Sequence, residues 1–476
     1  MTADYSFPRV AAPSSQGNAP YLRAATAVAK QLVADAISVG SGSTWVGDDL
    51  QGESPETSTL VREPVGPSLY SGAAGIAWFL GHLATEDDSE GFARTAISGL
   101  SYALSEANGT LDDMTLSLHG GATGVALAAV EVGACLENRE LFHAGTSLAG
   151  RIAKLIGTGY VASEVDLMGG AAGIVIGLLA IYRRTAEEQL VNACKTACHA
   201  IISNRRTDCW GSSWSPPHAR KSDGLGLCGL GHGASGIALA LAEMAWITGE
   251  ARFWSVAEDA FLYERSWFSR DTCAWPDLRE PASSAPDETY PAAWTTAWCH
   301  GALGIGAARL RVYEMTQDLT ALAEASAAIH SARGLAAQAG MLLRSGRLVD
   351  VTLCHGLTGA VELMLMAHEV SGHFDHYRAA RTVGDTCLSI FKRNGGKWTC
   401  GLQKANDIPG LFLGSAGVGV TMMRLHDHSM IGSPLLAGRM QAGPSKGAPA
   451  VPRAIRTKPA THQARRSGHR PASLRP

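Results

Sequence analysis

A pair of glycines spaced three residues apart recurs seven times and constrains the fold more than any other feature of the chain. Each pair opens an apolar run, such as GIAWFLGHLA in the first repeat and GIALALAEMAW in the fourth. The first and last pairs lie 342 residues apart, so the six intervals average 57 residues. Self-similarity at a fixed period is the signature of a repeat architecture. The seven pairs are Gly72/Gly75, Gly121/Gly124, Gly170/Gly173, Gly233/Gly236, Gly301/Gly304, Gly356/Gly359 and Gly414/Gly417.

The apolar runs predict helices that are buried on all sides, because they lack a polar face. Short parallel strands are the competing interpretation of such runs. Their length of ten or more residues and their wealth of Ala and Leu favour helix. The glycines of each pair lie one turn apart at the start of the run, where the absence of a Cβ lets backbones crowd together. This role also explains why the chain contains 54 glycines.

An amphipathic segment precedes each buried run and predicts a second set of helices. The segments that begin at Tyr21, Glu140 and Tyr377 place apolar residues at i, i+3, i+4 and i+7, with charges between them. We therefore expect an all-α fold, an α/α toroid in which seven outer helices surround seven inner helices. An open solenoid of helical hairpins is the alternative, with interchangeable repeats and polar caps. The closed ring is favoured because the reactive side chains fall only in repeats three to six.

The repeats divide the chain into three expected parts. Residues 1–64 hold an outer helix and a polar loop, residues 65–431 form the toroid, and residues 432–476 form a disordered basic tail. Beyond Met440 there are eight Lys or Arg and no acidic residue, so the rest of the chain carries −11 against −3 overall. Such a tail could touch nucleic acid or anionic lipid, but we expect a solvated tail and no nucleic-acid partner.

The bulk composition predicts a soluble cytoplasmic protein. Hydrophobic residues make up 46% of the chain and charged residues 17%, as in globular proteins. The N-terminus lacks the basic and apolar regions of a secretory signal. The longest apolar stretch, around Gly173 to Tyr182, is too short to cross a bilayer, so no transmembrane segment is expected. Ten cysteines in such a chain are expected to be reduced thiols.

The tripeptide Cys-His-Gly occurs twice, each time at the start of an expected inner helix, whereas composition predicts about 0.04 occurrences. Thiolate and imidazole are preferred zinc ligands, and the positive ends of helix dipoles favour thiolate over thiol. A single buried cysteine would be read as a small core residue, but two tripeptides in phase with the repeat predict one zinc ion. A three-ligand site has four candidates, Cys299, His300, Cys354 and His355, and the spacing does not choose among them.

Two further residues share the phase of these candidates. His232, in GLGHGASG, stands where His300 and His355 stand in their own repeats, so it is expected to point toward the same rim. There it could serve as a general acid or base near neutral pH, or be a core histidine bonded to a carbonyl. Asp166, in EVDLMGGAAG, lies four residues before a glycine pair and by itself would be read as a capping carboxylate.

The segments DLMGGAAGI, GHGASGI, AWCHGALGIG, LCHGLTGA and PGLFLGSAGVG resemble the lanthionine synthetase C-like family, the cyclases of lanthipeptide biosynthesis. The resemblance covers about Leu69 to Leu425. It implies a double ring of helices. It implies that Cys299, Cys354 and His355 bind zinc and that His300, in the first Cys-His-Gly tripeptide, does not. It also implies that Asp166 and His232 are the acid/base residues.

The reaction implied by the resemblance is an intramolecular Michael addition in a dehydrated precursor peptide. Zinc lowers the pKa of a peptide cysteine, and the thiolate adds to dehydroalanine or dehydrobutyrine to give a thioether ring. Two features of the chain depart from the stand-alone cyclases of the family. The first is Thr295, where those cyclases often carry Arg. AWCHGALGIG is closer to the cyclase half of two-domain synthetases, yet the chain has no room for their dehydratase domain. A separate dehydratase partner, or another thiol-addition substrate, is therefore expected.

Three alternatives stay open from the sequence. One is an enzyme that adds a free thiol such as glutathione to a dehydrated protein residue. Another is a sugar enzyme on a helical toroid, which would need paired inward carboxylates, whereas Asp166 stands nearly alone. The third is a non-catalytic peptide-binding module that keeps zinc for its structure.

Overall fold

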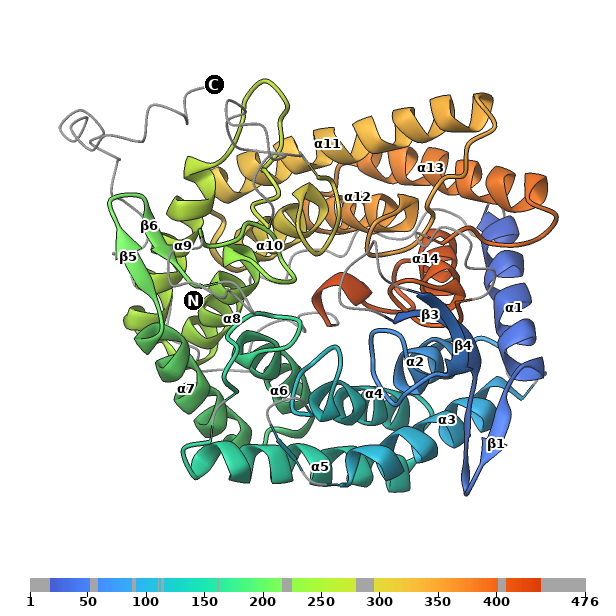
Figure 1. Ribbon diagram of the computed structural model, residues 1–476, viewed down its shortest axis with the longest axis horizontal. Helices are drawn as coiled ribbons and strands as arrows, with labels where there is room; N and C mark the ends of the chain where they lie inside the picture. The colour runs from blue at the N-terminus through green and yellow to red at the C-terminus, as the bar shows by residue number, and fades with distance from the viewer. Residues whose placement is uncertain are drawn as a thin grey trace, which may run out of the picture.

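The computed structural model describes residues 18–51, 59–87, 91–109, 111–112, 115–160, 162–215, 225–279, 295–400 and 408–437. In this part of the chain, fourteen α-helices form two concentric rings, which confirms the predicted all-α toroid (Figure 1). The inner ring comprises α2 (Ala73–Leu83), α4 (Ala122–Cys135), α6 (Ala171–Thr185), α8 (Ala234–Thr248), α10 (Ala302–Thr316), α12 (Leu357–Ser371) and α14 (Ser415–His426). The outer ring comprises α1 (Ala19–Ala34), α3 (Phe92–Ala107), α5 (Arg139–Gly157), α7 (Glu188–Ser203), α9 (Ala251–Ser266), α11 (Leu319–Arg344) and α13 (Phe374–Arg393).

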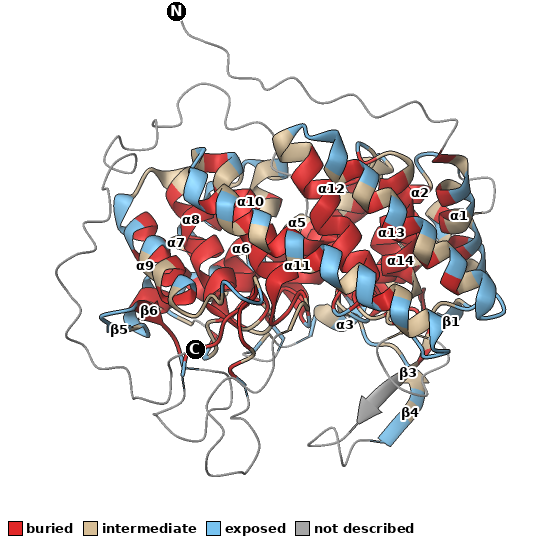
Figure 2. Cartoon of the chain, turned by 90° about the horizontal axis from the view of Figure 1, so that it is seen from above, coloured by how far each residue is buried: buried red, intermediate tan, exposed pale blue. Residues whose placement is uncertain are grey.

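Burial separates the two rings, as the hydrophobic patterns predict. Every residue of α2 is buried, and α8 is buried from Ala234 to Ala245. The outer helices bury one face only; in α5 this face includes Leu141, Leu148 and Ile152. Figure 2 shows the buried positions gathered on the inner helices and the exposed positions on the outer surface. The first outer helix, α1, packs against the last inner helix, α14, so the two ends of the repeat array meet.

The two glycines of each pair have different roles at the start of the inner helix. The first glycine, such as Gly72, is the helix N-cap in an extended conformation. The second glycine allows close approach between neighbouring repeats. A Cβ added to Gly75 would overlap the Leu69 carbonyl and lie 2.8 Å from the Leu411 Cβ of repeat seven. Repeat one therefore packs directly on repeat seven, which closes the ring.

Backbone hydrogen bonds join the loops that precede the inner helices, here called the rim loops. A residue two positions before a glycine pair takes part in each of the six bonds. The links are Tyr70 N–H to His119 O, Leu167 N–H to Gly231 O, Gly231 N–H to Cys299 O, Trp298 N–H to Cys354 O, Cys354 N–H to Phe412 O, and Phe412 N–H to Tyr70 O. Rim loops far apart in sequence are thus fixed against each other.

Short β-hairpins interrupt the helical pattern and correct one prediction. The polar loop that was expected between the first outer helix and residue 65 contains two antiparallel hairpins. They pair β1 (Ile37–Val39) with β2 (Gly42–Thr44) and β3 (Val46–Gln51) with β4 (Thr59–Pro64). A third hairpin, β5 (Arg206–Asp208) with β6 (Gly211–Ser213), follows α7. Four of these strands have only three residues, fewer than the four to eight over which an alternating pattern is recognised.

The chain after α14 turns back into the ring, so the predicted tail boundary at residue 432 is too early. Residues Pro434–Leu436 form a 3₁₀ turn in which all three side chains are buried. The Leu435 carbonyl accepts a hydrogen bond from the Trp298 indole at 3.1 Å, and the Ser433 hydroxyl bonds Glu362. The remainder of the predicted tail, residues 438–476, lies outside the described residues. None of the described helices is both long and apolar enough to span a membrane.

Candidate metal centre

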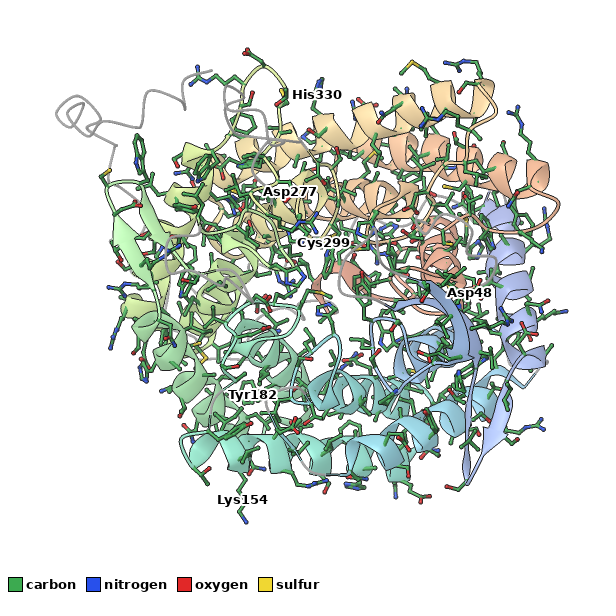
Figure 3. The ribbon with its side chains drawn as sticks, in the orientation of Figure 1. Asp48, Lys154, Tyr182, Asp277, Cys299 and His330 are labelled. Atoms are coloured by element: carbon green, nitrogen blue, oxygen red, sulfur yellow. The ribbon has the colours of Figure 1, made fainter. Side chains whose placement is uncertain are left out.

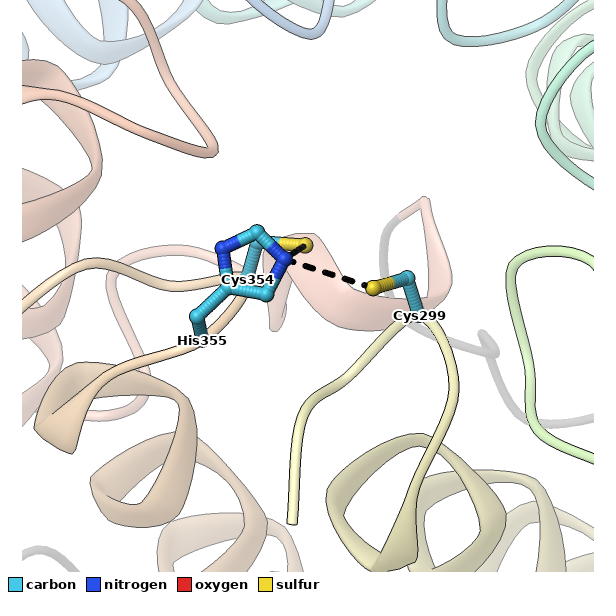
Figure 4. A group of neighbouring side chains, drawn as sticks. All are labelled: Cys299, Cys354 and His355. Atoms are coloured by element: carbon cyan, nitrogen blue, oxygen red, sulfur yellow. Dashed lines mark hydrogen bonds between the residues drawn. The ribbon is translucent and has the colours of Figure 1, made fainter. Parts of the chain in front are cut away.

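Cys299, Cys354 and His355 come together at the inner edge of the ring. Figure 3 shows Cys299 near the central opening, whereas Lys154 and His330 lie at the outer edge. The His355 Nε2 is 3.5 Å from the Cys299 Sγ and 3.4 Å from the Cys354 Sγ (Figure 4). All three ligand atoms lie within 4.8 Å of one another, and among the described residues this is the one such group arranged to hold a metal ion.

The spacing of the three side chains fits zinc. Bond lengths near 2.3 Å to sulfur and 2.1 Å to nitrogen place tetrahedral S and N ligands about 3.6 Å apart, close to the two observed distances. The two cysteines are buried and His355 is exposed, so an ion held by these three residues would be reachable from solvent. Three protein ligands leave one coordination position for a substrate.

The electrostatics of the group favour one thiolate. A hydrogen bond from Cys354, together with the one from His355, holds the pKa of Cys299 well below its ordinary value. Burial raises the pKa of the Cys354 thiol well above its ordinary value. Burial lowers the pKa of His355, but its hydrogen bond to Cys299 and the negative charges of Cys299 and Asp350 together outweigh burial and leave that pKa raised. A thiolate is the form of cysteine that binds a metal ion.

His300, the fourth candidate from the sequence, lies outside this group. Its side chain is buried, and its Nδ1 has no hydrogen-bond partner among the described residues. Burial lowers the pKa of His300 to about 4, so the ring is neutral. It stacks on His232 with ring centroids 5.0 Å apart. The two tripeptides therefore differ in their histidines: one faces the cysteines and the other supports His232.

Asp166 and His232 form a hydrogen-bonded pair beside the cysteines. The His232 Nδ1 lies 2.6 Å from the Asp166 Oδ2. The other oxygen of Asp166 accepts the amides of Gly169 and Gly170 at 2.8 and 3.0 Å, so the backbone immediately before α6 anchors the carboxylate. Burial lowers the pKa of His232, but the Asp166 hydrogen bond and charge outweigh it and leave that pKa raised.

A cavity of about 250 Å³ opens beside this pair, between repeats three and four. Its polar wall includes Asp166, His232 and Asn204, and its apolar wall includes Trp214 and Ile237. His232 is 32% exposed, whereas Asp166 is 2% exposed. A substrate group can therefore reach the imidazole more easily than the carboxylate.

Tyr70 joins the site, although the sequence reasoning missed it. Its hydroxyl hydrogen-bonds the Cys354 sulfur, and burial raises the pKa of Tyr70, so it remains a donor. Its ring stacks on Phe412 with centroids 4.8 Å apart. The signal that could have found Tyr70 is its phase, because it stands in repeat one where the cysteines stand in repeats five and six.

Arg279 is a second residue that the sequence reasoning missed. It is paired with Asp277 in the segment after α9, and its positive charge acts to lower the pKa of His232, His300 and His355. No repeat position marks this residue, because it lies between repeats. Cys228 is buried and is not part of the metal-binding group, and burial raises the pKa of its thiol well above the ordinary value.

Comparison with protein families matches residues 63–435 to the family described as "Lanthionine synthetase C-like protein". The chain belongs to the lanthionine synthetase C-like family. The match spans all seven repeats and ends within the buried turn after α14, so it confirms the resemblance read from the motifs. A search of curated protein sequences finds no match.

Comparison with solved structures finds matches at low sequence identity. "Nisin cyclase" superimposes with a TM-score of 0.54 at 17% identity, over 76% of this chain and 89% of that chain. A GH76 α-mannanase from Bacteroides thetaiotaomicron gives 0.47 at 9% identity, over 87% and 96%. Cellobiose 2-epimerase from Spirochaeta thermophila gives 0.43 at 12% identity, over 88% and 100%. The nisin cyclase likeness establishes a common fold for the two proteins.

Proposed function

We propose that this protein is a zinc-dependent cyclase that adds peptide cysteine thiols to dehydroalanine or dehydrobutyrine and so forms lanthionine-type thioether rings. Membership of the lanthionine synthetase C-like family and the likeness to nisin cyclase support a cyclase. The observation that carries the proposal is the pairing of two different sites on one rim. A Cys-Cys-His group suited to zinc lies beside an Asp–His pair suited to proton transfer.

Cys299, Cys354 and His355 would hold the zinc ion. When bound, zinc supplies Lewis acidity that lowers the pKa of a substrate thiol toward neutrality. A thiolate ligand set leaves the metal less positive than a histidine set would, and this keeps a substrate sulfur nucleophilic. These three residues therefore account for activation of the nucleophile.

His232 would supply the proton that completes the addition. A new bond joins sulfur to the β-carbon of the dehydro residue, the carbon–carbon double bond is consumed, and the α-carbon gains a proton. With Nδ1 held by Asp166, the Nε2 of His232 is left to donate that proton. The raised pKa of His232 increases the protonated fraction near neutral pH, as a general acid requires.

Asp166 would act as a positioning residue. Both of its oxygens are engaged, one by His232 and the other by two backbone amides, and its side chain is buried. It fixes the imidazole orientation and stabilises the imidazolium, as an acid partner of a catalytic histidine does. The substrate is then a dehydrated precursor peptide, delivered in the cytoplasm by a separate dehydratase.

Addition of a free thiol such as glutathione is the second candidate, because the same residues would activate either thiol. A non-catalytic peptide-binding module is the third. Exposure of His232 and His355 favours an enzyme over this module, because a structural zinc site is closed by a fourth protein ligand.

The test is single-turnover conversion of a dehydrated peptide that carries free cysteines, followed by mass after alkylation of the remaining thiols. Ring formation protects cysteines from alkylation, and added glutathione would instead raise the mass. We expect His232→Ala to keep zinc and peptide affinity but to close rings about 10²- to 10⁴-fold more slowly. If the protein contains zinc and binds the peptide but never accelerates thioether formation, the proposal that it is an enzyme is refuted.

A further inference from the structure

A buried carboxylate on the outer ring reaches the rim loop that carries His232. Glu264 lies near the end of α9 and is fully buried. Its Oε1 accepts the backbone N–H of Gly229, three residues before His232, at 2.8 Å. A carboxylate in this position also faces the positive end of α8, which begins at Ala234.

A buried cation holds this carboxylate in place. The Arg309 guanidinium of α10 donates to the Glu264 Oε2 at 2.9 Å and to the Ser235 hydroxyl at 3.1 Å. The Ser235 hydroxyl itself donates to Glu264. Arg309 also pairs with Glu324 and covers the Phe261 ring at 4.1 Å. Buried charges of this kind are tolerated only when their hydrogen bonds are satisfied, so Glu264 has little freedom to move.

The loop between Glu264 and the metal centre is equally confined. Gly229 has a φ of +113°, and a Cβ there would lie 2.7 Å from both the Cys299 carbonyl oxygen and the His300 Cα. Two residues later, the Gly231 N–H donates to the Cys299 carbonyl at 2.9 Å. The loop is therefore held on one side by the backbone of Cys299 and on the other by Glu264.

We propose that Glu264 is a positioning residue that fixes the loop Cys228–His232, and through it the distance between the His232 imidazole and the cysteines. This role rests on the proposed cyclase function. It explains why a charged network is buried between repeats four and five, where apolar side chains would pack at lower cost. A small displacement of a catalytic group is enough to reduce the rate about 10- to 100-fold.

The test compares Glu264→Gln with Glu243→Gln. Glu243 lies on α8, is 2% exposed and pairs with Arg183 and Arg311, so its variant also breaks a buried ion pair. We expect both variants to lower the melting temperature. Only Glu264→Gln should reduce kcat for ring closure, about 10- to 100-fold with KM little changed. Only Glu264→Gln should speed amide hydrogen exchange in the peptide that covers residues 225–236.

Equal kcat losses in the two variants, or unchanged exchange at residues 225–236 in Glu264→Gln, would overturn the proposal. If Glu264→Gln does not fold, two double variants are compared instead: Glu264→Gln/Arg309→Met and Glu243→Gln/Arg311→Met. In each double variant the methionine removes the buried arginine charge that the glutamine leaves without a carboxylate partner. The exchange comparison needs no substrate. A wild-type protein that fails to close rings would therefore refute the proposed function, while the role of Glu264 is still decided by exchange.

Discussion

Replacing Asp166 by Asn separates the geometry of the Asp–His pair from its charge. Asparagine keeps the shape of the side chain, and its oxygen can still accept the Gly169 and Gly170 amides. The negative charge that faces the His232 Nδ1 at 2.6 Å is lost. We therefore expect the α6 terminus to stay intact while the pKa of His232 falls, because burial continues to lower it and the charge no longer raises it.

The size of the rate loss in Asp166→Asn depends on how far the His232 side chain is exposed to solvent. A hydrogen bond to a charged group contributes about 1.5–3 kcal/mol. Because the His232 side chain is 32% exposed, solvent screening favours the lower end, about 1.5–2 kcal/mol. If the pair is needed in the transition state, ring closure should slow about 10- to 30-fold. This loss is smaller than that of His232→Ala, which removes the acid altogether.

The pH dependence gives an independent check. The protonated imidazole is present below its pKa, so the falling limb of the rate profile should move to lower pH in Asp166→Asn. The raised pKa of His232 contributes stability that is complete below about pH 6.5 and is lost as pH rises through the folded-state pKa. The variant should therefore lose more melting temperature at about pH 5.5 than at about pH 8.5.

Single-turnover rates and melting curves across this range, with zinc content measured in parallel, test the argument. Asp318→Asn is a matched control, because Asp318 caps α11 through the Thr320 amide and faces no histidine in that contact. An Asp166→Asn variant that closes rings at the wild-type rate with an unshifted pH profile would show that the charge plays no part in the reaction.

Three further outcomes are expected. Zinc analysis should find one ion per chain, with most of it lost in Cys299→Ala, Cys354→Ala and His355→Ala but not in His300→Ala; the opposite result for the two histidines would reverse the ligand assignment. Tyr70→Phe should weaken metal affinity about 10- to 100-fold by chelator competition, because it removes the donor to Cys354; unchanged affinity would show that this hydrogen bond does not tune the site. Deleting residues 443–476 should leave the melting temperature unchanged. By contrast, Leu435→Ala should cost about 2–5 kcal/mol of unfolding free energy, because Leu435 is buried in the ring. A large drop in melting temperature on deletion would contradict the predicted solvated tail.

The sequence by itself determined the toroid, because the pattern of a glycine pair followed by an apolar run occurs seven times. Each glycine pair starts an inner helix, and each apolar run leaves that helix no face for water. The phase of the repeat also placed Cys299 and Cys354 at one position of the rim and His232 at the next, because residues at equivalent positions of equivalent repeats lie at equivalent places. Family motifs then narrowed the ligands to three residues.

Only the tertiary structure decided which side chains meet. Cys-His-Gly is identical in repeats five and six, yet His355 turns toward the cysteines and His300 stacks on His232. The partners of the site, Tyr70 and Glu264, come from repeat one and from the outer ring, hundreds or tens of residues away. Periodicity describes what each repeat does alone, whereas these contacts depend on closure of the ring and on rim-loop conformations that only neighbouring repeats impose.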